Sequence, residues 1–379
     1  MKRIYLDYAA STPLDPRVKE VMEPFWNEVF ANAGSRHQDG ASAKKAVEDS
    51  RETISKILEV KSEEVIFTSG GTESNSLAII GFLNYLREEG RLGGAHIITS
   101  TTEHPSVLEA FQRHQKKGLK VDFVPVLSDG LVDLNRLKEM VGDKTVLVSI
   151  AYVNSEIGVV QPLREISNLI KKKNPKTVFH TDASQAPVFL DIKVSRLGVD
   201  MMTLDGQKIY GPKGVGVLYK SSGVNLSPVL LGGSQEGGLR PGTENTPLIV
   251  GIAKALEIAE LERLEVVEKI LPLRNHLIDS LFSLSDKIFL NGSREHRSAG
   301  NVNISVIGED SEFLFVKLDK EGVSCSTKSA CINKHEEGSY VLQALGNDDR
   351  KSGLRFSLGK NTTKKEIDKV VEILRKILS

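Results

Sequence analysis

Short apolar runs rich in β-branched residues alternate with amphipathic stretches between about residues 60 and 220. The runs predict seven strands, at residues 64–69, 95–100, 120–126, 145–152, 177–182, 200–204 and 214–219. Apolar positions at helical spacing predict helices between most of these runs, at residues 73–89, 106–117, 134–141 and 164–173. Because strands that alternate with helices typically pair in parallel and are covered on both faces, we expect an α/β fold around a mostly parallel seven-stranded sheet.

The pattern changes toward the C-terminus. Residues 232–246 are rich in glycine and irregular, and a long helical pattern then covers residues 247–284. We expect Pro272 to interrupt this helix, because proline lacks the backbone N–H. The rest of the chain mixes strands, at 301–306 and 353–358, with helices at 311–320 and 364–378. We therefore expect a large α/β domain at residues 15–255 and a smaller α+β domain formed by residues 1–14 and 256–379.

Composition argues against several classes of protein. Fifty lysines and arginines balance fifty aspartates and glutamates over 379 residues, which argues against direct binding to nucleic acid. No apolar run approaches the roughly 18 residues of a membrane-spanning helix, and the N-terminal MKRIYLDYAA lacks the apolar core of a signal peptide. Two cysteines and eight scattered histidines offer neither a disulfide framework nor a zinc motif. We expect a cytoplasmic protein that contacts no membrane and holds no metal.

Polar residues gather directly after the predicted strands. In an open α/β sheet, ligands bind beyond the carboxyl ends of the strands, which meet at one edge. The residues that follow strands in this way are the Gly70-Gly71-Thr72 loop, His104, Asn154, Asp182 with Gln185 close behind it, and Lys208. Each alone has a plainer interpretation, such as a strand–helix turn, a helix-entry histidine, a turn cap or a solvated lysine. Together at one edge they indicate a site.

This set of groups suits pyridoxal 5′-phosphate (PLP). A lysine amine forms the Schiff base with this cofactor, and a carboxylate beside the ring nitrogen keeps that nitrogen protonated. An imidazole can stack on the ring, and the free N–H groups at a helix N-terminus bind phosphate. The GPKGVG run after Lys208 lacks the residue order of a P-loop, so we set a nucleotide-binding loop aside.

Longer motifs extend along nearly the whole chain: YLDYAASTPLDPRV, TSGGTESNSLAI, TEHPSVL, NSEIGVVQPL, HTDASQAP, KIYGPKGVG, GLRPGTENTPLIVG, STKSAC and RFSLGKNTTKKEID. With these motifs the chain resembles the cysteine desulfurases, in the class V aminotransferase branch of the fold-type I PLP-dependent enzymes. The resemblance implies a large PLP-binding domain with a smaller domain, assembled as a homodimer. It also implies an enzyme that converts L-cysteine to L-alanine and passes the sulfur to an acceptor protein, either an iron–sulfur scaffold or a thiolation carrier.

The resemblance implies a role for each candidate residue. Lys208 would carry the cofactor as a covalent aldimine and move protons at the substrate Cα, while His104 would stack on the ring and assist acid–base steps. Asp182 would pair with the ring nitrogen. The other cofactor contacts would come from Gly71, Thr72, Asn154, Gln185 and, from the other subunit, Thr243. The substrate would be held by Asn154, by Asn32 and by Arg355, whose guanidinium suits a carboxylate.

The two cysteines receive different interpretations. The resemblance makes Cys331, in the STKSAC motif, the nucleophile whose thiolate takes the sulfur as a persulfide. Lys328 replaces the glycine usual in this motif and would favour the thiolate form, although a solvated loop lysine is an equally good interpretation. Cys325 lies in an apolar run, and we expect a buried structural thiol there.

One motif departs from the family at the lysine itself. Where the family typically has Ser-x-His before the lysine, this chain has Asp205-Gly206-Gln207. The serine and histidine contact the phosphate, whereas an ionised Asp205 cannot donate a hydrogen bond to it. We therefore expect Asp205 and Gln207 to lie at the phosphate and to hold it differently. Either Asp205 turns to a basic partner, or Gln207 and nearby N–H groups hold the phosphate.

Three functions compete. The leading hypothesis is a cysteine desulfurase. The second is another class V PLP enzyme, such as a selenocysteine lyase, an epimerase or an aminotransferase, but a nucleophilic Cys331 favours desulfuration. The third is a catalytically silent scaffold that binds sulfur carriers, and the presence of Lys208, Asp182, His104 and Cys331 argues against it.

Overall fold

A seven-stranded sheet forms the centre of the computed structural model, which describes residues 3–327, 338–346 and 353–378. Its strand order is β2-β8-β7-β6-β5-β3-β4, and β8 is antiparallel to both of its neighbours while the other pairs are parallel. The strands are β2 (Val65–Thr68), β3 (His96–Ser100), β4 (Lys120–Val124), β5 (Thr145–Ser149), β6 (Val178–Asp182), β7 (Met201–Asp205) and β8 (Gly216–Lys220). All seven predicted strands are therefore confirmed, and the fold is the expected α/β class.

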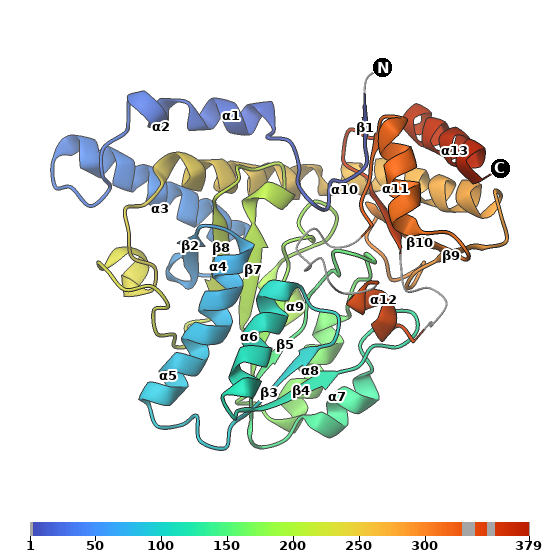
Figure 1. Ribbon diagram of the computed structural model, residues 1–379. Coiled ribbons are helices and arrows are strands. Elements are labelled where there is room, and N and C mark those ends of the chain that lie inside the picture. Colours follow the sequence, from blue (N-terminus) through green and yellow to red (C-terminus); the bar gives the residue numbers. More distant parts are fainter. Residues whose placement is uncertain (1–2, 328–337, 347–352, 379) are drawn as a thin grey trace.

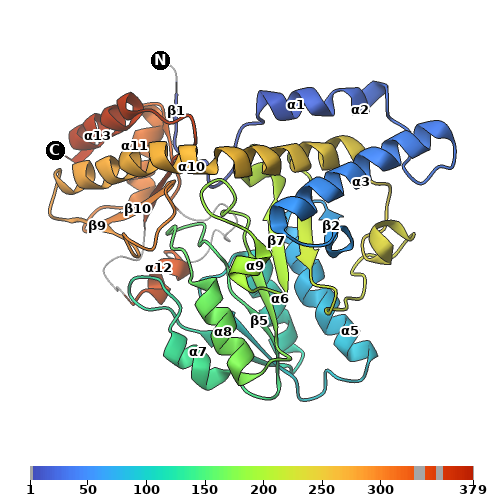
Figure 2. The same ribbon diagram turned by 180° about the vertical axis from the view of Figure 1, so that it is seen from behind.

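Successive residues of each strand pack on opposite faces of the sheet. Ile66 belongs to the core beneath α5 and α6, whereas Val65 and Phe67 belong to the core beneath α3, α8 and α10 (Thr246–Phe282). Figure 1 shows α5 (Phe82–Glu88) and α6 (Pro105–Lys116) in front of the sheet, and Figure 2 shows α3 (Gln38–Leu58) and α8 (Leu163–Lys173) on the other side. Because both faces are covered, strands such as β2, β5 and β8 carry apolar residues at successive positions instead of alternating with polar ones, which is what made them visible in the sequence.

The four predicted helices of this region are present. The first begins as α4 (Gly71–Ser76), continues through a π-helical turn (Leu77–Gly81) and ends as α5, and the others are α6, α7 (Leu134–Met140) and α8. Five α-helices of the described residues were not predicted: α1 (Pro16–Met22), α2 (Pro24–Asn27), α3, α9 (Val194–Leu197) and α12 (Tyr340–Ala344). The buried positions of α3 include Gly40, Ala43 and Ser50, so small residues replace the large apolar ones that reveal a helix in a sequence.

One long helix, α10 (Thr246–Phe282), runs across the whole molecule beneath α1 in both views (Figures 1 and 2). The expected interruption at Pro272 is wrong, because α10 continues through this residue. A proline removes one hydrogen bond from a helix, but Ile270, Leu277 and Ile278 are fully buried around it. Packing on both sides of the proline therefore holds the helix together.

The C-terminal part forms a smaller unit at one end of α10 (Figure 1). It contains the antiparallel sheet β12-β10-β9, with β9 (Ile288–Leu290), β10 (Asn301–Val306) and β12 (Leu354–Ser357), and the helices α11 (Ser311–Lys320), α12 (Tyr340–Ala344) and α13 (Lys364–Leu378). The N-terminal β1 (Ile4–Tyr5) pairs in parallel with β11 (Val323–Ser324). The predicted domain boundary at residues 255–256 falls inside α10. No helix in the described ranges combines the length and apolarity needed to cross a membrane.

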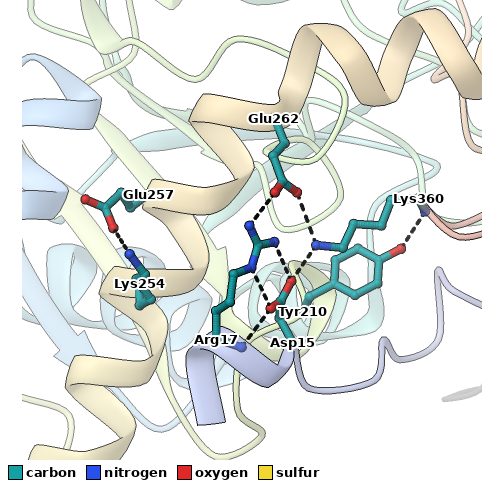
Figure 3. Close-up of polar contacts among 7 residues, drawn as sticks. All are labelled: Asp15, Arg17, Tyr210, Lys254, Glu257, Glu262 and Lys360. Atoms are coloured by element: carbon teal, nitrogen blue, oxygen red, sulfur yellow. Dashed lines mark hydrogen bonds and ion pairs between the residues drawn. The ribbon is translucent and has the colours of Figure 1, made fainter. Parts of the chain in front are cut away.

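A cluster of charged side chains joins the two parts of the chain (Figure 3). Asp15, which caps α1, accepts hydrogen bonds from Arg17 Nη2 at 2.8 Å and from Lys360 Nζ at 2.6 Å. Glu262 of α10 accepts from the same two cations. The backbone N–H of Lys360 donates to the hydroxyl of Tyr210 at 2.8 Å. The segment that follows β12 is thereby fixed to the turn that follows β7.

Candidate active site

A cavity of about 320 Å³ opens at the carboxyl ends of the parallel strands. The strands β2, β3, β5, β6 and β7 each deliver side chains to it from the turn that follows the strand. The structure brings together ten of the predicted site residues in its lining: Gly71, Thr72, His104, Asn154, Asp182, Gln185, Asp205, Gln207, Lys208 and Arg355. The predicted edge of the sheet is thus where these groups meet.

Lys208 ends a 3-10 turn, Gly206–Lys208, that directly follows β7. A Cβ on Gly206 would lie 2.7 Å from the carbonyl oxygen of Pro212, so only glycine permits this tight turn. The Lys208 Nζ donates hydrogen bonds to the carbonyl oxygens of Ala9 and Ala10, at 3.0 and 2.6 Å. The N-terminal segment therefore positions the amine over the cavity.

Asp182 and His104 flank the same cavity. Asp182 is the last residue of β6, and its carboxylate accepts from the backbone N–H of Ser184 at 2.9 Å and from Asn75 Nδ2 at 2.8 Å. His104 precedes α6 as its N-cap, and its Nδ1 accepts from the backbone N–H of Ser106 at 3.2 Å. Burial lowers the pKa of His104, although the negative charge of Asp182 acts in the opposite direction.

The N-terminus of α4 forms a narrow cradle. A Cβ on Gly71 would lie 3.1 Å from Ser184 Oγ and 3.2 Å from Asp205 Oδ2, so a larger residue would crowd both. Asp205 is buried at this point and accepts hydrogen bonds from the backbone N–H and from Nε2 of Gln207, each at 3.2 Å. Gln207 therefore holds the Asp205 carboxylate. The first arrangement considered, in which Asp205 turns to a basic partner, is not seen among the described residues.

Two amide side chains of the predicted site are engaged with the backbone. Asn154 Oδ1 accepts from the N–H groups of Glu156 and Ile157, both at 2.9 Å, and Asn154 Nδ2 donates to the carbonyl of Thr102 at 2.8 Å. Gln185 Nε2 donates to the carbonyl of Ala9 at 2.9 Å. These bonds fix both side chains at the cavity wall.

Arg355 comes from β12 and reaches the cavity from the smaller unit. Its Nη2 donates to Asp7 Oδ1 at 2.7 Å and its Nη1 to the carbonyl of Ser155 at 2.9 Å. Its Nε is buried and has no hydrogen-bond partner among the described residues. Burial raises the pKa of Asp7, while Arg355 and Lys208 oppose this change. The guanidinium is therefore oriented by two partners and keeps N–H groups for an anionic ligand.

Two predicted residues lie away from this cavity in the single chain. Asn32 and Thr243 are exposed and line a separate hollow of about 350 Å³, together with Phe30. Phe30 is 74 % exposed, which is unusual for a large apolar side chain. The predicted contribution of Thr243 from another subunit stays a prediction.

Of the two cysteines, Cys325 belongs to the described residues and Cys331 does not. Cys331 and Lys328 lie outside the described residues. Cys325 follows β11 and is buried, and burial raises its pKa to about 12. The expectation of a buried Cys325 is confirmed, and its thiol stays protonated at neutral pH.

Sequence reasoning missed several residues that line the cavity, notably Asn75, Glu103, Ser106 and Tyr340. Asn75 and Ser106 follow the recognised glycine loop and His104 by a few positions, in α4 and at the start of α6. Their side chains face the cavity because those helices start at its edge, so a search of whole helix N-termini, rather than of strand ends alone, would have found them.

Glu103 is a fully buried acid beside the site. Its Oε1 accepts from the backbone N–H of Ala151 at 2.9 Å, and its Oε2 has no hydrogen-bond partner among the described residues. Burial raises its pKa to about 8, from 4.5. The folded protein therefore keeps a proton on Glu103 at neutral pH that the unfolded chain has released.

Glu103→Gln should remove a pH-dependent loss of stability. Between about pH 4.5 and pH 8 the folded protein binds the proton and the unfolded chain does not, so the free energy of unfolding falls as pH rises. The decline from this one group is at most about 1.4 kcal/mol per pH unit. Glutamine keeps the bond from Ala151 and does not ionise, so its advantage over wild type should grow from pH 5 to pH 8 in urea unfolding. The exposed Glu63→Gln is the control, and parallel curves for Glu103→Gln and wild type would contradict the prediction.

Comparison with known proteins agrees with this geometry. Residues 4–370 match the family model described as aminotransferase class-V. The cysteine desulfurase IscS of Dictyoglomus turgidum is 41 % identical over 381 aligned positions, which cover 100 % of this chain and 95 % of that protein. Among solved structures, a NifS-like protein superposes with a TM-score of 0.92 at 34 % identity, covering 99 % of both chains. SspA in complex with cysteine superposes with a TM-score of 0.80 at 33 % identity, covering 95 % of this chain and 100 % of that one. The chain therefore belongs to the class V aminotransferases and, within them, to the cysteine desulfurases, which are PLP-dependent enzymes.

Proposed function

We propose that this chain binds PLP at Lys208, converts L-cysteine to L-alanine, and passes the sulfur through a persulfide on Cys331 to an acceptor protein. The observation that carries the proposal is the convergence of the Lys208 amine, the Asp182 carboxylate and the His104 ring on one cavity.

The residues around the cavity fit the cofactor. The amine, the carboxylate and the imidazole are the three groups that PLP enzymes use around the pyridine ring. The N-terminus of α4 at Gly71 and Thr72 offers free N–H groups for the phosphate. Asp205 lies against this cradle, and Gln207 holds its carboxylate through two hydrogen bonds. When bound, PLP supplies an electron sink for the bonds around the substrate Cα.

The protein groups bind the substrate and move its protons. Arg355 binds the carboxylate of cysteine with its remaining N–H groups, and this fixes the Cα near the amine of Lys208. Lys208 accepts and returns the proton at Cα. Asp182 would hold the nitrogen of the cofactor ring, and His104 would cover the face of that ring. The Cys331 thiolate attacks the substrate sulfur, so that the S–S bond of the persulfide forms while the Cβ–S bond of the substrate breaks, and alanine remains after proton return.

The assembly is part of the same proposal. A homodimer would bring Thr243 of one copy toward the cradle of the other and would cover the exposed Phe30. SspA, a structural relative, has been solved with cysteine, which supports cysteine as the substrate here. The acceptor would be an iron–sulfur scaffold or a thiolation carrier.

Incubation with L-cysteine and a reductant tests the proposal. Wild type should release alanine and sulfide in equal amounts, and Cys331→Ala should lose both by roughly 10³-fold, because the nucleophile is removed. The matched control is Cys325→Ala, since this buried thiol lies outside the cavity lining, and its rates should stay near wild type. Undiminished alanine production in Cys331→Ala would overturn the proposed role of the cysteine.

A further inference from the structure

A line of hydrogen bonds connects Asp182 with His104 along the wall of the cavity. Asn75 Nδ2 donates to Asp182 Oδ2 at 2.8 Å and to Ser106 Oγ at 2.9 Å. Ser106 Oγ in turn lies 2.8 Å from His104 Nδ1. Asn75 is 1 % exposed, so water does not compete for its bonds. The carboxylate and the imidazole, both predicted to contact the cofactor, are therefore linked through two side chains with no assigned role.

The direction of each bond in this line is determined by chemistry. An ionised carboxylate only accepts hydrogen bonds, so the amide of Asn75 must turn its NH₂ group toward Asp182. The second N–H of that group then points to Ser106 Oγ, which accepts it. Ser106 has one hydroxyl proton, and this proton is left for His104 Nδ1.

A second contact independently shows that His104 Nδ1 is a hydrogen-bond acceptor. The backbone N–H of Ser106 lies 3.2 Å from His104 Nδ1, because His104 is the N-cap of α6. A backbone N–H can only donate. His104 Nδ1 therefore accepts from both the backbone and the hydroxyl of Ser106, and it cannot carry a proton without losing both bonds.

We infer that Asn75 and Ser106 are positioning residues that keep His104 neutral, with its single proton on Nε2. The ring lines the cavity, and Nε2 has no hydrogen-bond partner among the described residues. His104 thus offers a hydrogen-bond donor to the bound ligand and not a base. The inference rests on the proposed function in one respect: the ligand that receives this hydrogen bond is the cofactor with its substrate. The resemblance implied acid–base steps for His104, and the inference limits its role to donation from Nε2.

Charged groups from several elements face His104. Asp182, the last residue of β6, and Asp205, the last residue of β7, favour a protonated ring, whereas burial and Lys208 oppose it. Glu103, directly before His104, is itself largely neutral at pH 7, since burial raises its pKa to about 8. Burial has the largest effect, and the pKa of His104 is lowered. The two bonds into Nδ1 favour the neutral ring further.

Nitrogen NMR of the holoenzyme labelled with ¹⁵N-histidine, recorded without L-cysteine, tests the inference. The His104 signals are assigned by their loss in His104→Gln. His104 should show a bare Nδ1 and a protonated Nε2 from pH 6 to pH 8. His114 on the same helix is the internal control: its Nδ1 lies 2.8 Å from the carbonyl oxygen of Ala110, which only accepts, so it must show the opposite tautomer. A proton on Nδ1 of His104 would overturn the inference.

Substitution of Ser106 tests whether its hydroxyl controls the protonation of His104 or only supports the fold. Ser106→Ala removes one of the two donors to Nδ1, so the pKa of His104 should rise by about one unit. The kcat should fall several-fold while KM for L-cysteine stays within about twofold, and Ser106→Thr should restore both the pKa and kcat. An unchanged pKa in Ser106→Ala would refute the role of the hydroxyl. Because the NMR needs no substrate, a chain that fails to desulfurate cysteine but shows this tautomer would refute the proposed function alone.

Discussion

Lys208→Ala should abolish the covalent attachment of PLP and lower cysteine desulfuration by at least about 10³-fold. Lys208 is the only lysine that lines the cavity within the described residues. Two backbone carbonyls hold its amine at the carboxyl end of β7. Because no other lysine in the described part of the chain lines the cavity, the loss should be close to complete.

Borohydride reduction followed by mass spectrometry of peptides measures the attachment directly. In wild type the mass of the reduced cofactor should appear on the peptide that contains Lys208, and in Lys208→Ala it should appear nowhere. Lys213→Ala is a matched control, because Lys213 belongs to the same loop region but is exposed. If Lys208→Ala kept its visible colour through dialysis and reduction, the assignment of this lysine would be wrong.

The sequence predicted the central sheet well because of how its strands are buried. Both faces of the sheet are covered, so most of its strands contain runs of successive apolar residues, and such runs bounded by turn residues are a clear signal in a sequence. Helix α3 escaped notice because glycine, alanine and serine occupy much of its buried face. At Pro272 the sequence predicted an interruption of the helix that does not occur. Proline alone favours a break, but the burial of Ile270 and Leu277 on either side keeps α10 continuous.

The candidate site was predictable as far as it follows from strand ends. Parallel strands end at one edge, so Asp182 and Lys208 could be placed together without any coordinates. A search of helix N-termini would have placed Asn75 and Ser106 at the same edge, but it would not have revealed the hydrogen bonds between them, because these depend on how α4 and α6 start beside each other. Asp205 shows a further limit: the sequence revealed an acid at the phosphate cradle, but only the structure shows that Gln207 holds it.

Arg355→Lys should raise KM for L-cysteine by about 10²-fold, corresponding to about 3 kcal/mol, with kcat changed much less. Arg355 is buried, and Asp7 and the carbonyl of Ser155 fix the plane of its guanidinium. A planar guanidinium can use its remaining N–H groups as a fork on a carboxylate, whereas a lysine offers a single point charge on a flexible stem. Binding of the substrate carboxylate should therefore weaken although the positive charge is kept.

Comparison of L-cysteine with cysteamine, which lacks the carboxylate, isolates this contact from any general disturbance of the fold. Wild type should prefer L-cysteine strongly, and Arg355→Lys should lose most of that preference while its kcat/KM for cysteamine stays near wild type. Arg294→Lys, at a partly exposed ion pair with Asp279, should leave the preference unchanged. If Arg355→Lys kept the wild-type preference, the carboxylate would have to be bound elsewhere, and the paired Asp7 and Arg355 would serve only to join β12 to the N-terminal segment.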